Sequence, residues 1–135
     1  MEPANVTVAH ESIVVNAPAD ELYARWLRFE EFPKFIKPMR EVKRIDETHF
    51  SFISGSNGDA RESSLEIMFK SAGRRIAWRI ISEGLGLAVV SFQAQLDGST
   101  EVTLKLRSAS NPLLSSARAT EYLTEFKRIA EAGSG

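Results

Sequence analysis

The feature that most constrains this sequence is a one-sided alternation of apolar and polar residues, repeated in several short segments between residues 41 and 107. Successive side chains of a β-strand point to opposite faces, so each segment predicts a strand with one apolar face. Turn residues, including Asp97-Gly98, separate the segments as in consecutive hairpins. The pattern therefore predicts an antiparallel sheet with one wet face. The predicted strands are 41–46, 49–53, 60–70, 75–81, 87–96 and 101–107.

Different patterns flank this region on both sides. Residues 7–15 are rich in valine and isoleucine and predict a first strand. Pro18, expected at the first helical position, and the acidic residues after it favour a helix over 19–28, followed by a short helix over 29–35. Apolar residues at helical spacing predict a long helix over 113–132.

Length and charge narrow the class of protein. The 135 residues suit a single domain, which we expect over 1–132, with 133–135 as a tail without fixed structure. The formal net charge of −1 gives no general attraction to nucleic acid. Neither a signal peptide nor a transmembrane segment is recognisable, so we expect a soluble, cytoplasmic protein.

The predicted elements also suggest a binding cavity. A curved sheet of about six or seven strands has a large apolar face that needs a cover. One terminal helix covers the length of that face but not its width, so we expect space for an apolar ligand.

The chain has no cysteine, and no cluster of acidic residues or histidines with metal-ligand spacing accompanies His10 or His49. We therefore expect no metal and no cofactor.

Several stretches resemble a known family. Residues 12–18 (Ser-Ile-Val-Val-Asn-Ala-Pro), then Leu22, Trp26 and residues 29–35 (Phe-Glu-Glu-Phe-Pro-Lys-Phe), are similar to the start of the polyketide cyclase/dehydrase branch of the START-like (SRPBCC) superfamily. Residues 75–79 (Arg-Ile-Ala-Trp-Arg) and 97–104 continue the likeness.

This resemblance implies an α+β helix-grip fold, in which a curved antiparallel sheet of about six or seven strands surrounds a long C-terminal helix. It also implies a pocket for a polyketide-like or lipid-like molecule. Three functions stay open: an apolar-ligand binding protein, a polyketide cyclase or aromatase guiding aldol ring closure, and a protein-interaction module with a vestigial pocket. An acyl carrier protein is a candidate partner, and the chain is expected to be a monomer or homodimer.

The chain departs from the cyclases of this family in one strand. The family's Ser-x-Arg pattern is replaced by Ile67 and Phe69. Arg61 and Ser63 lie earlier on that strand and share the parity of its apolar face. Arginine stays protonated and can stabilise an enolate, and the phenol of Tyr122 could act as an acid, so Arg61 and Tyr122 are the candidate catalytic residues.

The candidate ligand-binding residues are predominantly aromatic or aliphatic side chains expected on the inner face of the sheet or on one of the three predicted helices. Arg61 and Ser63 are the polar exceptions. The set is Trp26, Phe32, Phe52, Arg61, Ser63, Leu65, Ile67, Trp78, Val90, Phe92 and Tyr122.

Overall fold

The computed structural model describes residues 7–36, 39–54, 61–81, 85–108 and 116–133. Seven strands form one antiparallel sheet in the order β1-β7-β6-β5-β4-β3-β2. The predicted antiparallel sheet with a C-terminal helix is thereby confirmed. The elements are β1 (Thr7–Val15), α1 (Ala19–Trp26), the 3-10 helix η1 (Phe29–Lys34), β2 (Met39–Arg44), β3 (His49–Ser54), β4 (Arg61–Ser71), β5 (Arg75–Ile81), β6 (Leu85–Ala94), β7 (Thr100–Ser108) and α2 (Ser116–Gly133).

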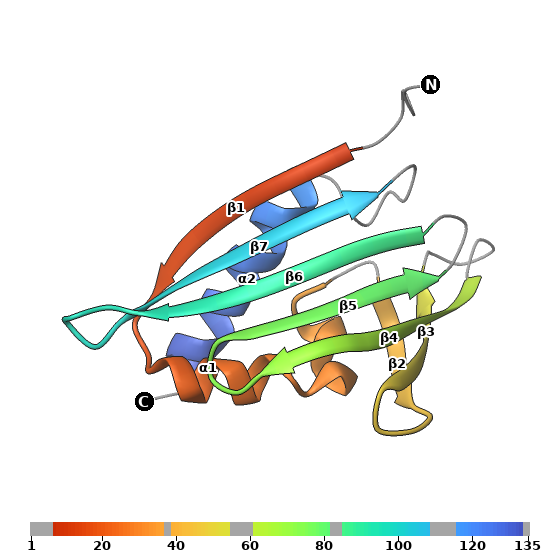
Figure 1. Ribbon diagram of the computed structural model, residues 1–135, viewed down its shortest axis with the longest axis horizontal. Coiled ribbons are helices and arrows are strands. Elements are labelled where there is room, and N and C mark those ends of the chain that lie inside the picture. Colours follow the sequence, from red (N-terminus) through yellow and green to blue (C-terminus); the bar gives the residue numbers. More distant parts are fainter. Residues whose placement is uncertain (1–6, 37–38, 55–60, 82–84, 109–115, 134–135) are drawn as a thin grey trace.

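Sequential hairpins build most of the sheet, since β2 to β7 follow one another in space as they do in the chain. The first strand, β1, joins the far edge by pairing with β7 along its whole length. Figure 1 shows α2 behind the sheet, where it crosses β1, β7 and β6, with α1 at one end of the strands. Side chains of α1, η1 and α2 are therefore buried against the inner face of the sheet.

Pro18 lies just before α1 as its N-cap residue, and not at the first helical position. The carbonyl oxygen of Pro18 accepts a hydrogen bond from the backbone N–H of Leu22 at 3.1 Å. The helix ends at Trp26, two residues before the predicted end, and a 3-10 helix with Pro33 inside follows. No helix among the described residues is long and apolar enough to cross a bilayer.

The inner face is occupied by the residues that strand and helix periodicity placed there. Strand and helix parity predict that nine residues are buried and that Glu66, Arg79, Gln93 and Lys105 are not. Both predictions are confirmed, since all nine are 7% exposed or less. The nine are Leu65, Ile67, Ile76, Trp78, Val90, Phe92, Leu104, Tyr122 and Phe126.

Strand alternation also places Phe69, Ala94 and Leu96 on the inner face, and these three expectations are wrong because all three side chains are exposed. Phe69 shares the sequence parity of Ile67, yet its side chain is 52% exposed whereas Ile67 is 7% exposed. The register explains the difference, because Ile67 pairs with Trp78 and Phe69 pairs with Ala77, which leaves Met68 without a partner. This β-bulge shifts the strand by one residue and turns Phe69 to the outer face.

Several element ends also differ from the prediction by one or two residues, and β2 covers 39–44 where 41–46 was predicted. Strand β6 ends at Ala94, and Leu96 lies in the following turn with its side chain fully exposed. Helix α2 continues to Gly133, one residue into the predicted tail. The predicted start of that helix, residues 113–115, lies outside the described residues.

The bulge predicts opposite outcomes for the same substitution at two positions. Ile67→Arg buries an unpaired charge and should lower the free energy of unfolding by more than about 3 kcal/mol. Phe69→Arg changes an exposed side chain and should stay within about 0.5 kcal/mol of the unsubstituted protein. Urea unfolding measures both values, and similar losses for the two variants would contradict the bulge.

Candidate functional site

An aromatic cluster fills the space between the sheet and the helices. Trp26, the last residue of α1, lies at the centre of this cluster and is completely buried. Its ring centroid lies 4.8 Å from that of Phe126 on α2 and 6.0 Å from that of Trp78 on β5. Further ring contacts join Trp26 to Phe32, Phe35 and Phe92. The cluster therefore ties α1, η1, the sheet and α2 to one another.

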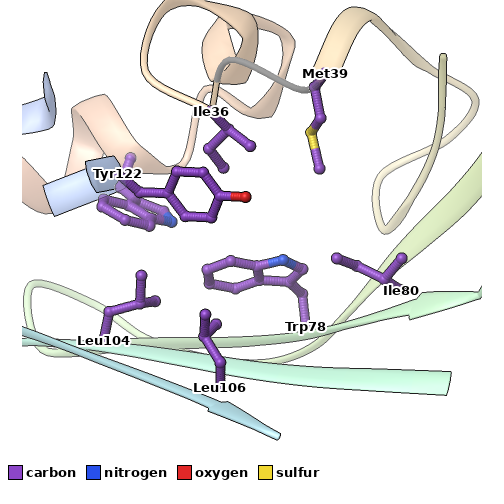
Figure 2. A pocket seen from close by; sticks show the side chains of 8 residues that line it. Ile36, Met39, Trp78, Ile80, Leu104, Leu106 and Tyr122 are labelled. Carbon is purple, nitrogen blue, oxygen red and sulfur yellow. The ribbon is translucent and has the colours of Figure 1, made fainter. Parts of the chain in front are cut away.

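A small cavity remains beside this cluster. Its volume is about 10 Å³, which is room for roughly one water molecule. In Figure 2 the Tyr122 hydroxyl points into the space between Met39 and Trp78. The lining residues are Trp26, Ile36, Met39, Trp78, Ile80, Leu104, Leu106 and Tyr122.

Burial controls the chemistry of Tyr122. The side chain is 2% exposed, and this burial raises the pKa of the phenol above its ordinary value, against a smaller opposing effect of the Arg118 charge. A neutral phenol can donate a hydrogen bond or a proton. Trp26 and Trp78 are the other lining residues with a side-chain donor, and the remaining five lining side chains carry none.

The structure brings together only part of the predicted site. Trp26, Trp78 and Tyr122 line the cavity. Six others are buried in the same core without lining it, namely Phe32, Phe52, Leu65, Ile67, Val90 and Phe92. Ser63 is half-buried on β4. Arg61 begins β4, and its side chain lies outside the described part of the structure.

Sequence reasoning missed five lining residues. Ile80, Leu104 and Leu106 share strand parity with residues predicted to be buried, so their inward direction was available from the alternation. Ile36 and Met39 lie where the chain passes from η1 into β2, and no regular period covers that junction. Only the fold places those two beside Trp78.

The histidines lie away from this cavity. His10 is exposed on β1, and His49 is exposed at the start of β3. The ring of His49 contacts Asp46 at 2.9 Å through Nδ1 and Glu66 at 3.3 Å through Nε2. Among the described residues, no group of three or more His, Asp or Glu side chains is arranged to hold a metal ion.

A larger hollow lies on the surface, between the start of α1 and the turn that joins β4 to β5. Its volume is about 690 Å³, and it is open to solvent. The walls carry both Asp20 and the exposed side chains of Arg74 and Arg75. Such a mixture of charges is typical of a solvated surface.

Comparison with known protein families gives one match. The family described as polyketide cyclase / dehydrase and lipid transport matches residues 15–117, which covers most of the chain. No curated protein sequence matches this chain significantly.

Solved structures share the fold. A protein from Deinococcus radiodurans is 24% identical with a TM-score of 0.78, over 94% of this chain and 99% of that one. A START superfamily protein from Mycobacterium smegmatis is 13% identical with a TM-score of 0.68, over 93% of this chain and 94% of that one.

The third structure is the di-domain aromatase/cyclase StfQ of the steffimycin biosynthetic pathway. It is 15% identical with a TM-score of 0.75, and the alignment covers 96% of this chain and 52% of that one. This chain therefore matches about half of that di-domain protein. At these identities the likeness extends to the fold and no further.

Burial of the Tyr122 phenol predicts a pH dependence of stability. Where the folded state holds a proton that the unfolded state releases, the free energy of unfolding falls as pH rises. Above about pH 10 we expect this loss to approach about 1.4 kcal/mol per pH unit from Tyr122 alone.

Tyr122→Phe removes the titrating group and keeps the ring, so its loss of stability above pH 10 should be shallower. Urea unfolding between pH 9 and 11.5 compares the two proteins. Equal slopes would show that burial does not hold the proton on Tyr122.

Proposed function

The chain belongs to the polyketide cyclase / dehydrase and lipid transport family, and from this membership we propose that it binds an apolar, polyketide-like or lipid-like small molecule between the sheet and α2. The observation that carries the proposal is the cavity beside Trp26 and Trp78, whose walls are aliphatic and aromatic side chains. Such walls favour an apolar ligand, because binding removes apolar surface of both the ligand and the cavity from water.

Binding requires the cavity to open. Pockets for drug-sized molecules have volumes of about 300–1,000 Å³, whereas this cavity has about 10 Å³. Met39 is the lining residue most suited to move, because its unbranched side chain adapts to several shapes. Only molecules with an open cavity can bind the ligand. The observed affinity is therefore the affinity of the open form multiplied by the fraction of molecules that are open.

A cyclase activity is the second candidate, and the buried phenol of Tyr122 is the observation that favours it. A protonated phenol beside the bound chain could donate to a carbonyl oxygen during ring closure, and Arg61 would stabilise the enolate. An acyl carrier protein would deliver the chain. Against this, Ile67 and Phe69 replace the polar pair of the family's cyclases, and Phe69 is on the outer face.

The third candidate is a protein-interaction module with a vestigial pocket, and the small size of the cavity favours it. The aromatic rings around Trp26 occupy space that a ligand would need. A ligand-binding test on variants that open or fill the cavity distinguishes this candidate from the first.

We expect the apolar fluorescent probe N-phenyl-1-naphthylamine to bind saturably, with a blue-shifted emission. Met39→Ala shortens a lining side chain and should raise the affinity several-fold. Leu106→Phe fills the cavity and should abolish binding, whereas Leu87→Phe, at a position that is 39% exposed, should leave it unchanged.

The bound probe should also raise the melting temperature, since ligand at 100 times its Kd stabilises the folded state by about 2.7 kcal/mol. Absence of saturable binding in both the unsubstituted protein and Met39→Ala would overturn the proposal and favour the interaction module.

A further inference from the structure

Strand β1 lies at one edge of the sheet, which is the upper edge in Figure 1. One side of the strand pairs with β7, from Thr7 opposite Ser108 to Val15 opposite Thr100. The backbone groups on the open side of an edge strand can pair with a strand of another chain, and proteins usually protect such edges. Whatever protects β1 therefore controls whether this sheet can add a strand.

The register of the sheet shows which backbone groups of β1 face the open side. At the turn between β6 and β7, the N–H of Gln95 donates to the carbonyl oxygen of Ser99 at 2.8 Å. Residues of an antiparallel strand bond alternately to one neighbour and the other, so the odd-numbered residues of β7 bond to β6 and the even-numbered ones bond to β1. Because Thr100 lies opposite Val15, the odd-numbered residues of β1 bond to β7. The residues that direct their N–H and C=O groups to the open side are therefore Val8, His10, Ser12 and Val14.

Helix α2 occupies one end of this open side. The Nζ of Lys127 donates to the carbonyl oxygen of Val14 at 2.8 Å, and the N–H of Asn16 donates to Oε2 of Glu131 at 2.9 Å. The two side chains, one helical turn apart, also form an ion pair at 2.6 Å. In a parallel ladder, one residue of a neighbouring strand would donate to the first of these backbone groups and accept from the second. Lys127 and Glu131 therefore take the place of a neighbouring strand.

A second copy of the chain fits the same edge in a defined register. When two β1 strands pair antiparallel about Glu11, Val8 lies opposite Val14 and His10 lies opposite Ser12, so their outward backbone groups meet as hydrogen-bonded pairs. Val8 is 69% exposed and Val14 is 47% exposed, and this register places the two valines next to each other. It also needs the carbonyl oxygen of Val14, which already accepts a hydrogen bond from the helix.

We propose that Lys127 and Glu131 keep the chain monomeric by blocking the antiparallel pairing of β1 with β1 of a second copy. Two Glu11 side chains would meet at the centre of that pairing, and their like charges act in the same direction. The proposal concerns the edge of the sheet and does not depend on the proposed function.

Sedimentation equilibrium at neutral pH measures the dimerisation. Lys127→Ala/Glu131→Ala removes both side chains that contact β1. Glu125→Ala/Arg128→Ala removes another ion pair of α2 and is the matched control. We expect the first double variant to dimerise with a Kd at least about tenfold lower than that of the control and of the unsubstituted protein. A first double variant that dimerises no more than the control overturns the proposal.

A disulfide identifies the strand and its register. The chain has no cysteine, so an introduced one is its only thiol. Residues opposed in a non-hydrogen-bonded pair have Cα atoms about 4.5 Å apart, which a disulfide can join. In the Lys127→Ala/Glu131→Ala background, Glu11→Cys should form a linked dimer under mild oxidation. Ser12→Cys should not, because Ser12 lies opposite His10 and not opposite itself.

A linked dimer of Ser12→Cys, or of neither cysteine variant, overturns the pairing of β1 with itself. Efficient linkage of Glu11→Cys with Lys127 and Glu131 still in place overturns their role as the block.

Lys127→Met tests the proposal with a smaller change. It keeps the length of the side chain and removes the ammonium group, and circular dichroism checks that the variant is folded. We expect it to lower the dimer Kd in the same direction as the double variant, by a smaller factor. A folded Lys127→Met with the dimerisation of the unsubstituted protein overturns the proposal, even where the double variant fails to fold.

Discussion

The packing of Trp26 against rings from four different elements is the interaction on which the rest of this structure depends. A seven-stranded sheet with one apolar face cannot be buried by a single helix, and the rings supplied by α1 and η1 fill what α2 leaves uncovered. Aromatic pairs contribute about 0.5–1.5 kcal/mol each beyond the area they bury. The same contacts hold α1 and η1 against the sheet and α2.

This close packing stabilises the fold and leaves little space for a ligand. An open pocket of ligand size would leave apolar walls without partner atoms, and lost packing of this kind is costly in protein interiors. The chain avoids that cost by collapsing its interior to a cavity of about 10 Å³. The proposed ligand binding would therefore require rearrangement of the aromatic cluster in this chain, at a cost in free energy that lowers the affinity.

The polar groups kept inside this packing are few, and they define the chemistry that the site can perform. Tyr122 retains its proton because burial disfavours the phenolate, and Trp26 holds a donor without an acceptor within the described residues. The bulge after Ile67 takes Phe69 out of the interior altogether. The interior of this chain is therefore almost entirely apolar among the described residues.

The sequence by itself determined the antiparallel sheet and which side chains of most strands face the interior. Period-two alternation is a local property of the backbone, so Leu65, Trp78 and Leu104 could be placed inside from their spacing alone. Tertiary structure decided the rest. The bulge that exposes Phe69 depends on how β4 pairs with β5, and the approach of Ile36 and Met39 to Trp78 joins segments that share no period. The size of the cavity was also beyond the sequence, because it is the small difference between the volume that the sheet encloses and the volume of the side chains that fill it.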